Sequence, residues 1–496
     1  MKILSVASEM FPLVKTGGLG DVTGSLPLAL SRDGIEMRTM LPAYPGMLAK
    51  ADACACLGTF RLLGEEAALF AAHAAGLDLL LLDAPALFDR DGGPYADATG
   101  RDHADNDRRF AALSLAAAEF AEGALGGGWR PDLVHTHDWQ AALTSVYLRH
   151  RQKSRLPVIL TIHNLAFQGQ FAFSRLRDLG LPPEAFSTDC LEYYGDVSFL
   201  KGGIRTADAV TTVSPTYARE ILGAGLGMGM EGVLADRRDA LTGIVNGIDP
   251  DVWNPATDPH VLSRYDGRTI ERRRINRKHL INEFGLADGP GPIFSVVSRL
   301  TWQKGIDLVI ENADRLVETG GRLIVCGQGE PGLEGALRDL ARRHPGRIAA
   351  RIGYDEKTAH LIHAGTDFVL QPSRFEPCGL TQLYALRYGA VPVVSRTGGL
   401  AETVIDANEA AFAHQTATGI QFHPVSAEHL GHALDRAVAL FSTPHLYRRV
   451  QAKGMETDFS WKASASRYAR LYRSLTGLRE PIGPDAREIA PARHFS

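Results

Sequence analysis

The chain has 496 residues, of which 45% are hydrophobic and 22% charged, and its formal net charge at pH 7 is −4. This length predicts two to four domains with large cores, and the mild acidity argues against a nucleic-acid surface, which needs a basic excess. No apolar run reaches the roughly 18 to 20 residues of a membrane span, and Met1-Lys2 leads directly into a strand pattern without a signal-peptide cleavage site. The five cysteines are scattered and odd in number, so we expect a cytoplasmic protein without a zinc site.

Short apolar runs alternate with helical patterns through the first half of the chain. Strands are predicted at 3–7, 77–82, 133–137, 158–162 and 209–213. Helices are predicted at 23–31, 108–122, from about 140 to 149, and at 217–222, and residues 15–22 form a glycine-rich loop before the first helix. This alternation predicts a mostly parallel, doubly wound sheet.

The alternation restarts after a turn-rich connection at 246–255. Strands are predicted at 293–297, 323–326, 347–352, 368–370 and 391–395, and helices at 305–318, 333–343, 357–364, 381–388 and from Gly398 onward. We therefore predict two α/β domains, 1–245 and 246–456, followed by a helical segment at 457–479 and a loose tail at 480–496. The cleft between the two domains is the expected ligand site.

Polar side chains follow several of these strands. The first half offers Lys15, Asp21, His137, Asp138 and His163, and the second offers Arg299, Lys304 and Glu376. Because the carboxyl ends of parallel strands meet at one edge of a sheet, each set is expected to gather, with cations opposite carboxylates across a cleft.

The stretch 373–405 has the strongest ligand-binding pattern. Glu376 stands next to a proline, Gly379 lets the backbone approach a ligand closely, and a helix begins at Thr381. Arg299 and Lys304 flank a turn after another strand, and two cations there suit a diphosphate, both bound and as a leaving group.

Each of these patterns also has a simpler interpretation. Arg299 and Lys304 could form surface salt bridges, Lys15 could sit in a simple turn, and His163 could be a core histidine. The match to G-x-G-x-x-G at 227–232 does not follow a strand, and the one at 327–332 has no acidic residue in 347–353, which disfavours a nicotinamide enzyme. The D-x-D pairs lack a strand-end context, which disfavours a metal-dependent sugar transferase.

Six motifs taken together resemble one family. They are Lys15-Thr-Gly-Gly-Leu-Gly-Asp21-Val, His135-Thr-His137-Asp138-Trp139, Thr161-Ile-His163-Asn164, Asn246-Gly-Ile-Asp249, Arg299-Leu-Thr-Trp-Gln-Lys304-Gly and Phe375-Glu376-Pro-Cys378-Gly-Leu. In this order, from residue 3 to about 475, the chain resembles the bacterial glycogen synthases, a family of retaining glycosyltransferases close to the plant starch synthases. The resemblance implies a GT-B fold, in which two Rossmann-like domains face each other across a deep cleft and the C-terminal helix packs back on the first.

The resemblance also implies an activity and its partners. Glucose would pass from ADP-glucose to the non-reducing end of glycogen or a malto-oligosaccharide, with retention at the anomeric carbon, with ADP as product, and with neither metal nor cofactor. The alternatives are the same fold using UDP-glucose or another acceptor, and a non-catalytic glucan-binding protein. Neither nucleic acid nor membrane is an expected partner, and the oligomeric state stays open.

Site residues carry over by motif. The implied catalytic set is His163, Arg299, Lys304, Glu376, Asp138 and Asp21. The implied substrate-binding set is Lys15, Gly18, Asn246, Gln303, Tyr354, Cys378, Gly379, Leu380 and Thr381. Arg299 and Lys304 would hold the diphosphate, Glu376 the sugar hydroxyls, and Tyr354 would stack on adenine.

The mechanism of retention follows from the carboxylates available. A double displacement needs a carboxylate on the sugar face opposite the leaving group. Neither half supplies an unambiguous one, and the position at which related enzymes often carry a second glutamate is Tyr384. We therefore favour attack on the same face as the departing diphosphate, within a site that domain closure shields from water.

Overall fold

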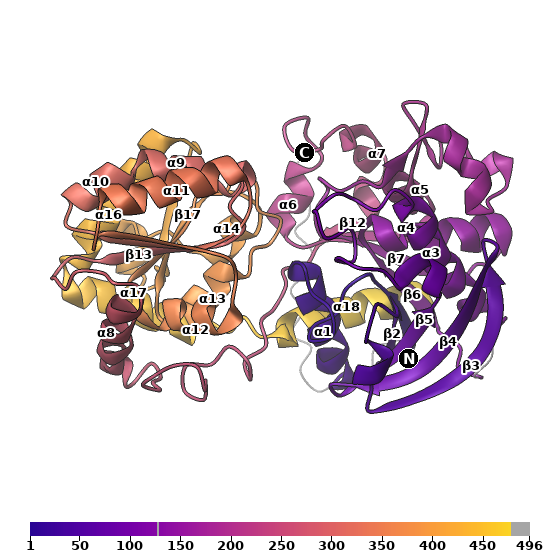
Figure 1. Ribbon diagram of the computed structural model, residues 1–496, viewed down its shortest axis with the longest axis horizontal. Helices are drawn as coiled ribbons and strands as arrows, with labels where there is room; N and C mark the ends of the chain where they lie inside the picture. Colours follow the sequence, from indigo (N-terminus) through magenta and orange to yellow (C-terminus); the bar gives the residue numbers. More distant parts are fainter. Residues whose placement is uncertain (126–127, 478–496) are drawn as a thin grey trace.

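The computed structural model describes residues 1–125 and 128–477. The chain forms two halves, each built on its own sheet (Figure 1). The loose tail predicted at 480–496 lies outside the described residues.

The first half contains a nine-stranded sheet in the order β12-β11-β7-β6-β1-β2-β5-β4-β3. Its strands are β1 (Lys2–Val6), β2 (Glu36–Pro42), β3 (Ala53–Leu62), β4 (Glu65–Ala74), β5 (Leu77–Asp83), β6 (Leu133–His137), β7 (Val158–Ile162), β11 (Ala209–Thr212) and β12 (Leu241–Gly243). The strands from β12 to β5 pair in parallel, as the alternation predicts. A small antiparallel sheet holds β8 (Gln170–Phe171), β9 (Glu192–Tyr193) and β10 (Asp196–Ser198).

Helices cover this sheet. They are α1 (Gly18–Ser31), α2 (Pro85–Phe88), α3 (Asn106–Glu122), α4 (Asp138–Val146), α5 (Phe199–Thr206), α6 (Pro215–Glu220) and α7 (Glu231–Ala235), with a π-helical turn at Tyr147–Arg151. The alanine-rich α3 is buried along most of its length, because its small side chains let it pack closely.

Two predictions for this half were wrong or incomplete. Residues 18–22 are not a loop but the first turn of α1, because the carboxylate of Glu9 accepts hydrogen bonds from the backbone N–H groups of Thr16 and Gly17 just before the helix. The antiparallel strands β3 and β4 were missed. Strand β4 is alanine-rich and lacks clear alternation, and here nine cross-strand residue pairs override its helix propensity.

The second half contains a six-stranded parallel sheet in the order β15-β14-β13-β16-β17-β18. The strands are β13 (Ile293–Val297), β14 (Arg322–Gly327), β15 (Ile348–Ile352), β16 (Phe368–Gln371), β17 (Val391–Ser395) and β18 (Ile420–Phe422). The helices are α8 (Arg273–Glu283), α9 (Ile306–Glu311), α10 (Ala313–Glu318), α11 (Pro331–Arg343), α12 (Glu356–Gly365), α13 (Thr381–Arg387), α14 (Gly398–Thr403), α15 (Glu409–Ala413), α16 (Ala427–Phe441) and α17 (Pro444–Glu456).

The helix predicted at 305–318 is interrupted. Asn312 lies between α9 and α10, and its side-chain amide donates to the carbonyls of Leu308 and Ala427, each at 2.9 Å. The second bond reaches the start of α16, so a tertiary contact accompanies the break.

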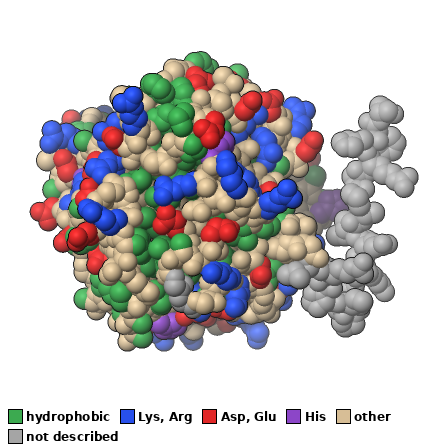
Figure 2. Space-filling view, turned by 90° about the vertical axis from the view of Figure 1, so that its right-hand side faces the viewer, with side chains coloured by type: hydrophobic (Ala, Val, Ile, Leu, Met, Phe, Trp, Pro, Cys, Tyr) green, Lys and Arg blue, Asp and Glu red, His purple; other side chains and the backbone are tan. Residues whose placement is uncertain are grey.

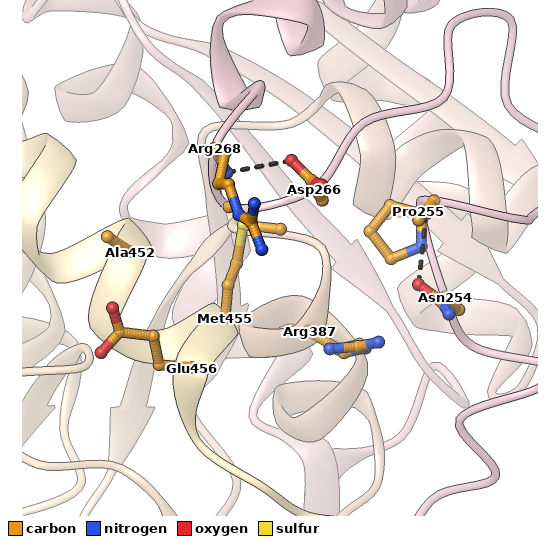
Figure 3. Close-up of a pocket in the computed structure, with 10 residues that line it drawn as sticks. Asn254, Pro255, Asp266, Arg268, Arg387, Ala452, Met455 and Glu456 are labelled. Atoms are coloured by element: carbon orange, nitrogen blue, oxygen red, sulfur yellow. Dashed lines mark hydrogen bonds between the residues drawn. The ribbon is translucent and has the colours of Figure 1, made fainter.

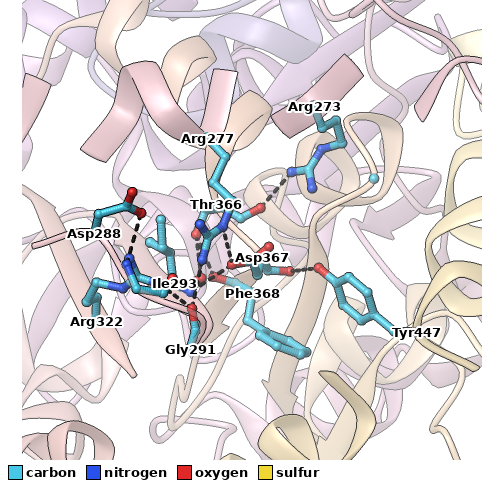
Figure 4. A network of polar contacts seen from close by, with 12 residues as sticks. Arg273, Arg277, Asp288, Gly291, Ile293, Arg322, Thr366, Asp367, Phe368 and Tyr447 are labelled. Carbon is cyan, nitrogen blue, oxygen red and sulfur yellow. Dashed lines mark hydrogen bonds and ion pairs between the residues drawn. The ribbon is translucent and has the colours of Figure 1, made fainter. Parts of the chain in front are cut away.

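A buried polar network fixes the amino ends of β13 and β16 (Figure 4). The carboxylate of Asp367 accepts from the backbone N–H of Ile293 at 2.8 Å and from Arg277 at 3.2 Å. The carbonyl of Asp367 accepts from the Tyr447 hydroxyl at 3.0 Å, and Arg273 donates to the Thr366 carbonyl at 2.6 Å. Helices α8 and α17 are thereby tied to the amino ends of these strands, opposite the carboxyl ends where the site is predicted.

The final helix, α18 (Trp461–Thr476), packs back on the first half, as the family resemblance implies (Figure 1). Its buried residues Ala465, Tyr468 and Tyr472 share one apolar cluster with Val22 and Leu26 of α1. The chain crosses between the halves twice, near Ile248 and near Phe459. A hydrogen bond joins the two crossings, because the N–H of Ile248 donates to the Phe459 carbonyl at 2.8 Å.

Positive and negative side chains are interspersed on the face of the first half that Figure 2 shows. Among residues 1–125 and 128–477, no helix is both long and apolar enough to cross a membrane.

Candidate active site

The neighbouring strands β13 and β16 bring together two residues that are 72 positions apart. Nζ of Lys304 lies 2.6 Å from Oε2 of Glu376, and the Ser373 hydroxyl donates to the same oxygen at 3.0 Å. The side chains of Lys304 and Glu376 are only 18% and 7% exposed, so water screens this ion pair weakly.

Arg299 and Gln303 stand on the same turn as Lys304. Arg299 is exposed and donates only a long bond of 3.5 Å to Oε1 of Gln303, so its guanidinium keeps the capacity to bind a ligand. The Gln303 amide donates to the Phe375 carbonyl at 3.3 Å, which joins the turn to the segment that carries Glu376.

The backbone between Cys378 and Thr381 forms a tight turn. Gly379 has a φ of +73°, and a side chain there would collide with Gln382, whose amide donates to the Gly379 carbonyl at 2.9 Å. The Thr381 hydroxyl donates to the Val297 carbonyl at 3.4 Å. Burial raises the pKa of the Cys378 thiol to about 12, so this group stays protonated.

The N-terminal loop approaches this turn from the other half. A Cβ at Gly18 would lie 3.9 Å from Leu380, so these two predicted residues face each other across the domain boundary. Lys15 pairs with Asp21 at 2.7 Å, and burial raises the pKa of Asp21. The predicted residue Asn246 is buried shortly after the end of β12.

A second cluster lies where the neighbouring strands β6 and β7 end. Nδ1 of His137 lies 3.0 Å from Nε2 of His163. Asp138 has a φ of +55°, and its carboxylate accepts the backbone N–H of His163 at 2.7 Å. Burial raises the pKa of Asp138 to about 7 and lowers that of His163 to about 3, so the imidazole is neutral at pH 7.

Contacts between α6 and the second half join these clusters. The Ser214 hydroxyl donates to the Pro377 carbonyl at 2.7 Å, next to Glu376. The Glu220 carboxylate accepts from the Gly398 N–H and the Thr397 hydroxyl, both at 3.0 Å. In Figure 1, α6 and α14 meet at the boundary between the halves.

Tyr354 and Tyr384 have different environments. Tyr354 is 55% exposed, so its ring is free to stack on a base. Tyr384 is buried and stacks on Trp253, with ring centroids 3.6 Å apart. Tyr384, which stands where related enzymes often carry a second glutamate, is thus part of an aromatic stack.

Sequence reasoning missed three side chains that shape the site. Glu9 accepts the Thr16 hydroxyl at 2.6 Å and also bonds to the Tyr95 hydroxyl, and so it positions the loop that carries Lys15. Ser373 holds Glu376, as described above. The position of Glu9 just beyond the first strand was a usable signal, whereas nothing in the sequence marks Tyr95.

A separate pocket of about 470 Å³ lies in the second half (Figure 3). It is lined by Asn254, Pro255, Ala256, Asp266, Gly267, Arg268, Arg387, Ala452, Met455 and Glu456. None of the predicted site residues lines it, so the strand ends remain the candidate site. Within the part of the chain that the structure describes, no group of three His, Cys, Asp or Glu residues is arranged to hold a metal ion.

Comparison with known proteins defines the class first. Residues 2–236 match the starch synthase catalytic domain, and residues 278–450 match glycosyl transferases group 1. The catalytic domain of starch synthase IV from Arabidopsis thaliana, solved with ADP and acarbose, is similar with a TM-score of 0.87 and 31% identity over 96% of this chain and 99% of that one. The fold is therefore that of a GT-B glycosyltransferase.

Two curated relatives are closer in sequence. Glycogen synthase of Rhizobium johnstonii is 58% identical and glycogen synthase 1 of Rhizobium meliloti 57% identical, each over 96% of this chain and 99% of the relative. The chain belongs to the bacterial glycogen synthase family, as the motifs predicted.

Proposed function

We propose that this enzyme transfers glucose from ADP-glucose to the non-reducing end of an α-1,4-glucan, with retention at the anomeric carbon and without a metal. The observation that carries the proposal is the weakly screened Lys304–Glu376 pair at 2.6 Å, with the exposed Arg299 on the same turn. A binding protein needs no such concentration of charge at the end of a buried strand. A transferase uses it to hold a diphosphate and a sugar side by side.

The donor would lie against the second half. Arg299 and Lys304 would contact the diphosphate and stabilise the negative charge that grows as it leaves. Glu376, buried and held by Ser373, would accept hydrogen bonds from sugar hydroxyls. Tyr354 would stack on adenine with its exposed ring.

The first half would close the site. Lys15 and Gly18 would contact the donor from the loop that Glu9 positions. His163 would stand near the reacting carbon as a neutral ring, and Asp138 would hold its backbone rather than act as a base. Tyr384 is buried where a second carboxylate would stand, so we favour attack of the acceptor hydroxyl on the anomeric carbon from the face that the diphosphate leaves. The bond from that carbon to the diphosphate breaks as the new bond forms, and the departing diphosphate takes up the hydroxyl proton.

The test is glucose incorporation into glycogen by the purified enzyme, with ADP-glucose and UDP-glucose in parallel, each with and without EDTA. We expect strong incorporation from ADP-glucose that EDTA does not change. A preference for UDP-glucose would overturn the donor assignment, but it would leave the assignment of Arg299 and Lys304 to the diphosphate unchanged. Glucan binding without transfer from either donor would instead favour a non-catalytic binding protein.

A further inference from the structure

Three imidazole rings lie in a row at the carboxyl ends of β6 and β7, and the roles proposed above use only one of them. His137 is 1% exposed and lies between His135 and His163, with ring centroids 4.2 and 5.2 Å away. Its Nδ1 is 3.0 Å from Nε2 of His163, and its Nε2 is 3.3 Å from the hydroxyl of Ser5. Each ring nitrogen of His137 therefore has one partner.

The outer two rings are held differently. Nδ1 of His135 lies 2.8 Å from the Tyr472 hydroxyl and Nε2 lies 2.6 Å from the Thr161 hydroxyl, so His135 secures α18 against the sheet. His163 has its backbone N–H bonded to Asp138 and one ring nitrogen bonded to His137. Within residues 1–125 and 128–477, Nδ1 of His163 has no hydrogen-bond partner, and the side chain is partly exposed.

The bond between two neutral imidazoles links their tautomers. In such a pair one nitrogen donates and the other accepts. When Nδ1 of His137 donates, His163 carries its proton on Nδ1, and when Nδ1 of His137 accepts, Nδ1 of His163 is a bare acceptor. The Ser5 hydroxyl, which can donate or accept, completes the chain at the far end.

We propose that His137 is a positioning residue for glucosyl transfer. Its bond to Nε2 fixes the ring rotation of His163 and ties the tautomer of His163 to its own, so that Nδ1 of His163 meets a hydroxyl of the glucose being transferred. This inference rests on the proposed function, because it takes His163 to be the ring that contacts the sugar. His137 itself touches no substrate.

Two substitutions at one position separate positioning from packing. The amide of His137→Asn stands close to the place of the imidazole Nδ1 and can donate to or accept from His163, whereas the amide of His137→Gln reaches toward Ser5 instead. Both variants lose the ring contact with His135, so their thermal midpoints are expected to fall together. We expect kcat/KM to fall about 10-fold to 100-fold in His137→Gln, the range known for groups that orient a metal-ligating histidine through its other ring nitrogen, and to stay within about threefold of wild type in His137→Asn.

Equal losses in both variants would show that His137 serves only packing, and wild-type activity in both would show that it has no role. Either result overturns the proposal. Nitrogen NMR of enzyme with ¹⁵N-labelled histidine gives a readout without turnover. Because the chain has 17 histidines, the His163 signals are assigned by their loss in His163→Ala.

The tautomer balance of His163 is expected to be the same in wild type and in His137→Asn, and to change in His137→Gln. An unchanged tautomer in His137→Gln would overturn the coupling even where activity falls. If the wild type transferred no glucose, the proposed function would fail, and the same spectra would still decide whether His137 sets the state of His163.

Discussion

Replacing Lys304 by alanine removes the cation that stands against Glu376. The ammonium group lies 2.6 Å from the carboxylate, and its side chain is 18% exposed. In the proposed reaction this cation faces the diphosphate as its bond to glucose breaks. Its loss therefore acts on the transition state more than on the bound donor.

The size of the effect follows from charge and distance. At an effective dielectric constant of about 20, a unit charge about 4 Å from a phosphate oxygen contributes about 4 kcal/mol. Removing one preorganised donor from a developing oxyanion costs about 2.7–4 kcal/mol in well-studied enzymes, or about 10²-fold to 10³-fold in kcat. We expect Lys304→Ala to lower kcat by that factor.

The fold should survive the substitution. Glu376 keeps its bond from the Ser373 hydroxyl at 3.0 Å, and since Lys304 is partly exposed we expect a stability loss below about 3 kcal/mol. Lys453→Ala is the matched control, because Lys453 forms a surface pair with Glu456 at 3.6 Å. Steady-state kinetics with ADP-glucose, together with urea unfolding, measure both effects. Turnover equal to that of the control variant would refute the role of Lys304 in stabilising the departing diphosphate.

Two further variants test the N-terminal half and the domain boundary. Burial raises the pKa of Asp138 from 3.8 to about 7, so as the pH rises from 4 to 7 the unfolded chain releases a proton that the folded chain keeps, and stability falls. Asp138→Asn keeps an acceptor for the backbone N–H of His163 but has no titrating proton. The urea midpoint of this variant relative to that of wild type should therefore rise between pH 4 and pH 7, and a difference in midpoint that stays constant would contradict this. Glu220→Ala removes the bonds to Gly398 and Thr397, each of which contributes about 1.5–3 kcal/mol as a charged acceptor. Its radius of gyration by X-ray scattering should increase, and an identical value would show that this contact does not hold the halves together.

The sequence predicted most of what the parallel sheets determine. The buried strands are short apolar runs such as 293–297 and 391–395, and their pattern does not depend on distant partners. Because β13 lies next to β16 and β6 next to β7, residues at their carboxyl ends meet, as Lys304 with Glu376 and His137 with His163. Strand order is thus the step that turns separate motifs into one site.

What the sequence could not predict depends on tertiary contacts. The start of α1 at Gly18 requires the carboxylate of Glu9, which is nine residues earlier and satisfies the N–H groups of the preceding loop. Strand β4 is alanine-rich and β3 is largely exposed, so only their pairing reveals them. The meeting of Gly18 with Leu380 requires both halves to be placed, which no local pattern provides.

Retaining transfer in a shielded site is tested most directly by one time course of the wild-type enzyme with ADP-glucose and maltoheptaose. ADP release and acceptor elongation are measured in the same reaction, and the new linkage is read by proton NMR. A shielded, retaining transferase predicts one ADP for each glucose added and only α-linkages at the non-reducing end. ADP release faster than elongation would show that water reaches the site, and a β-linked product would rule out retention.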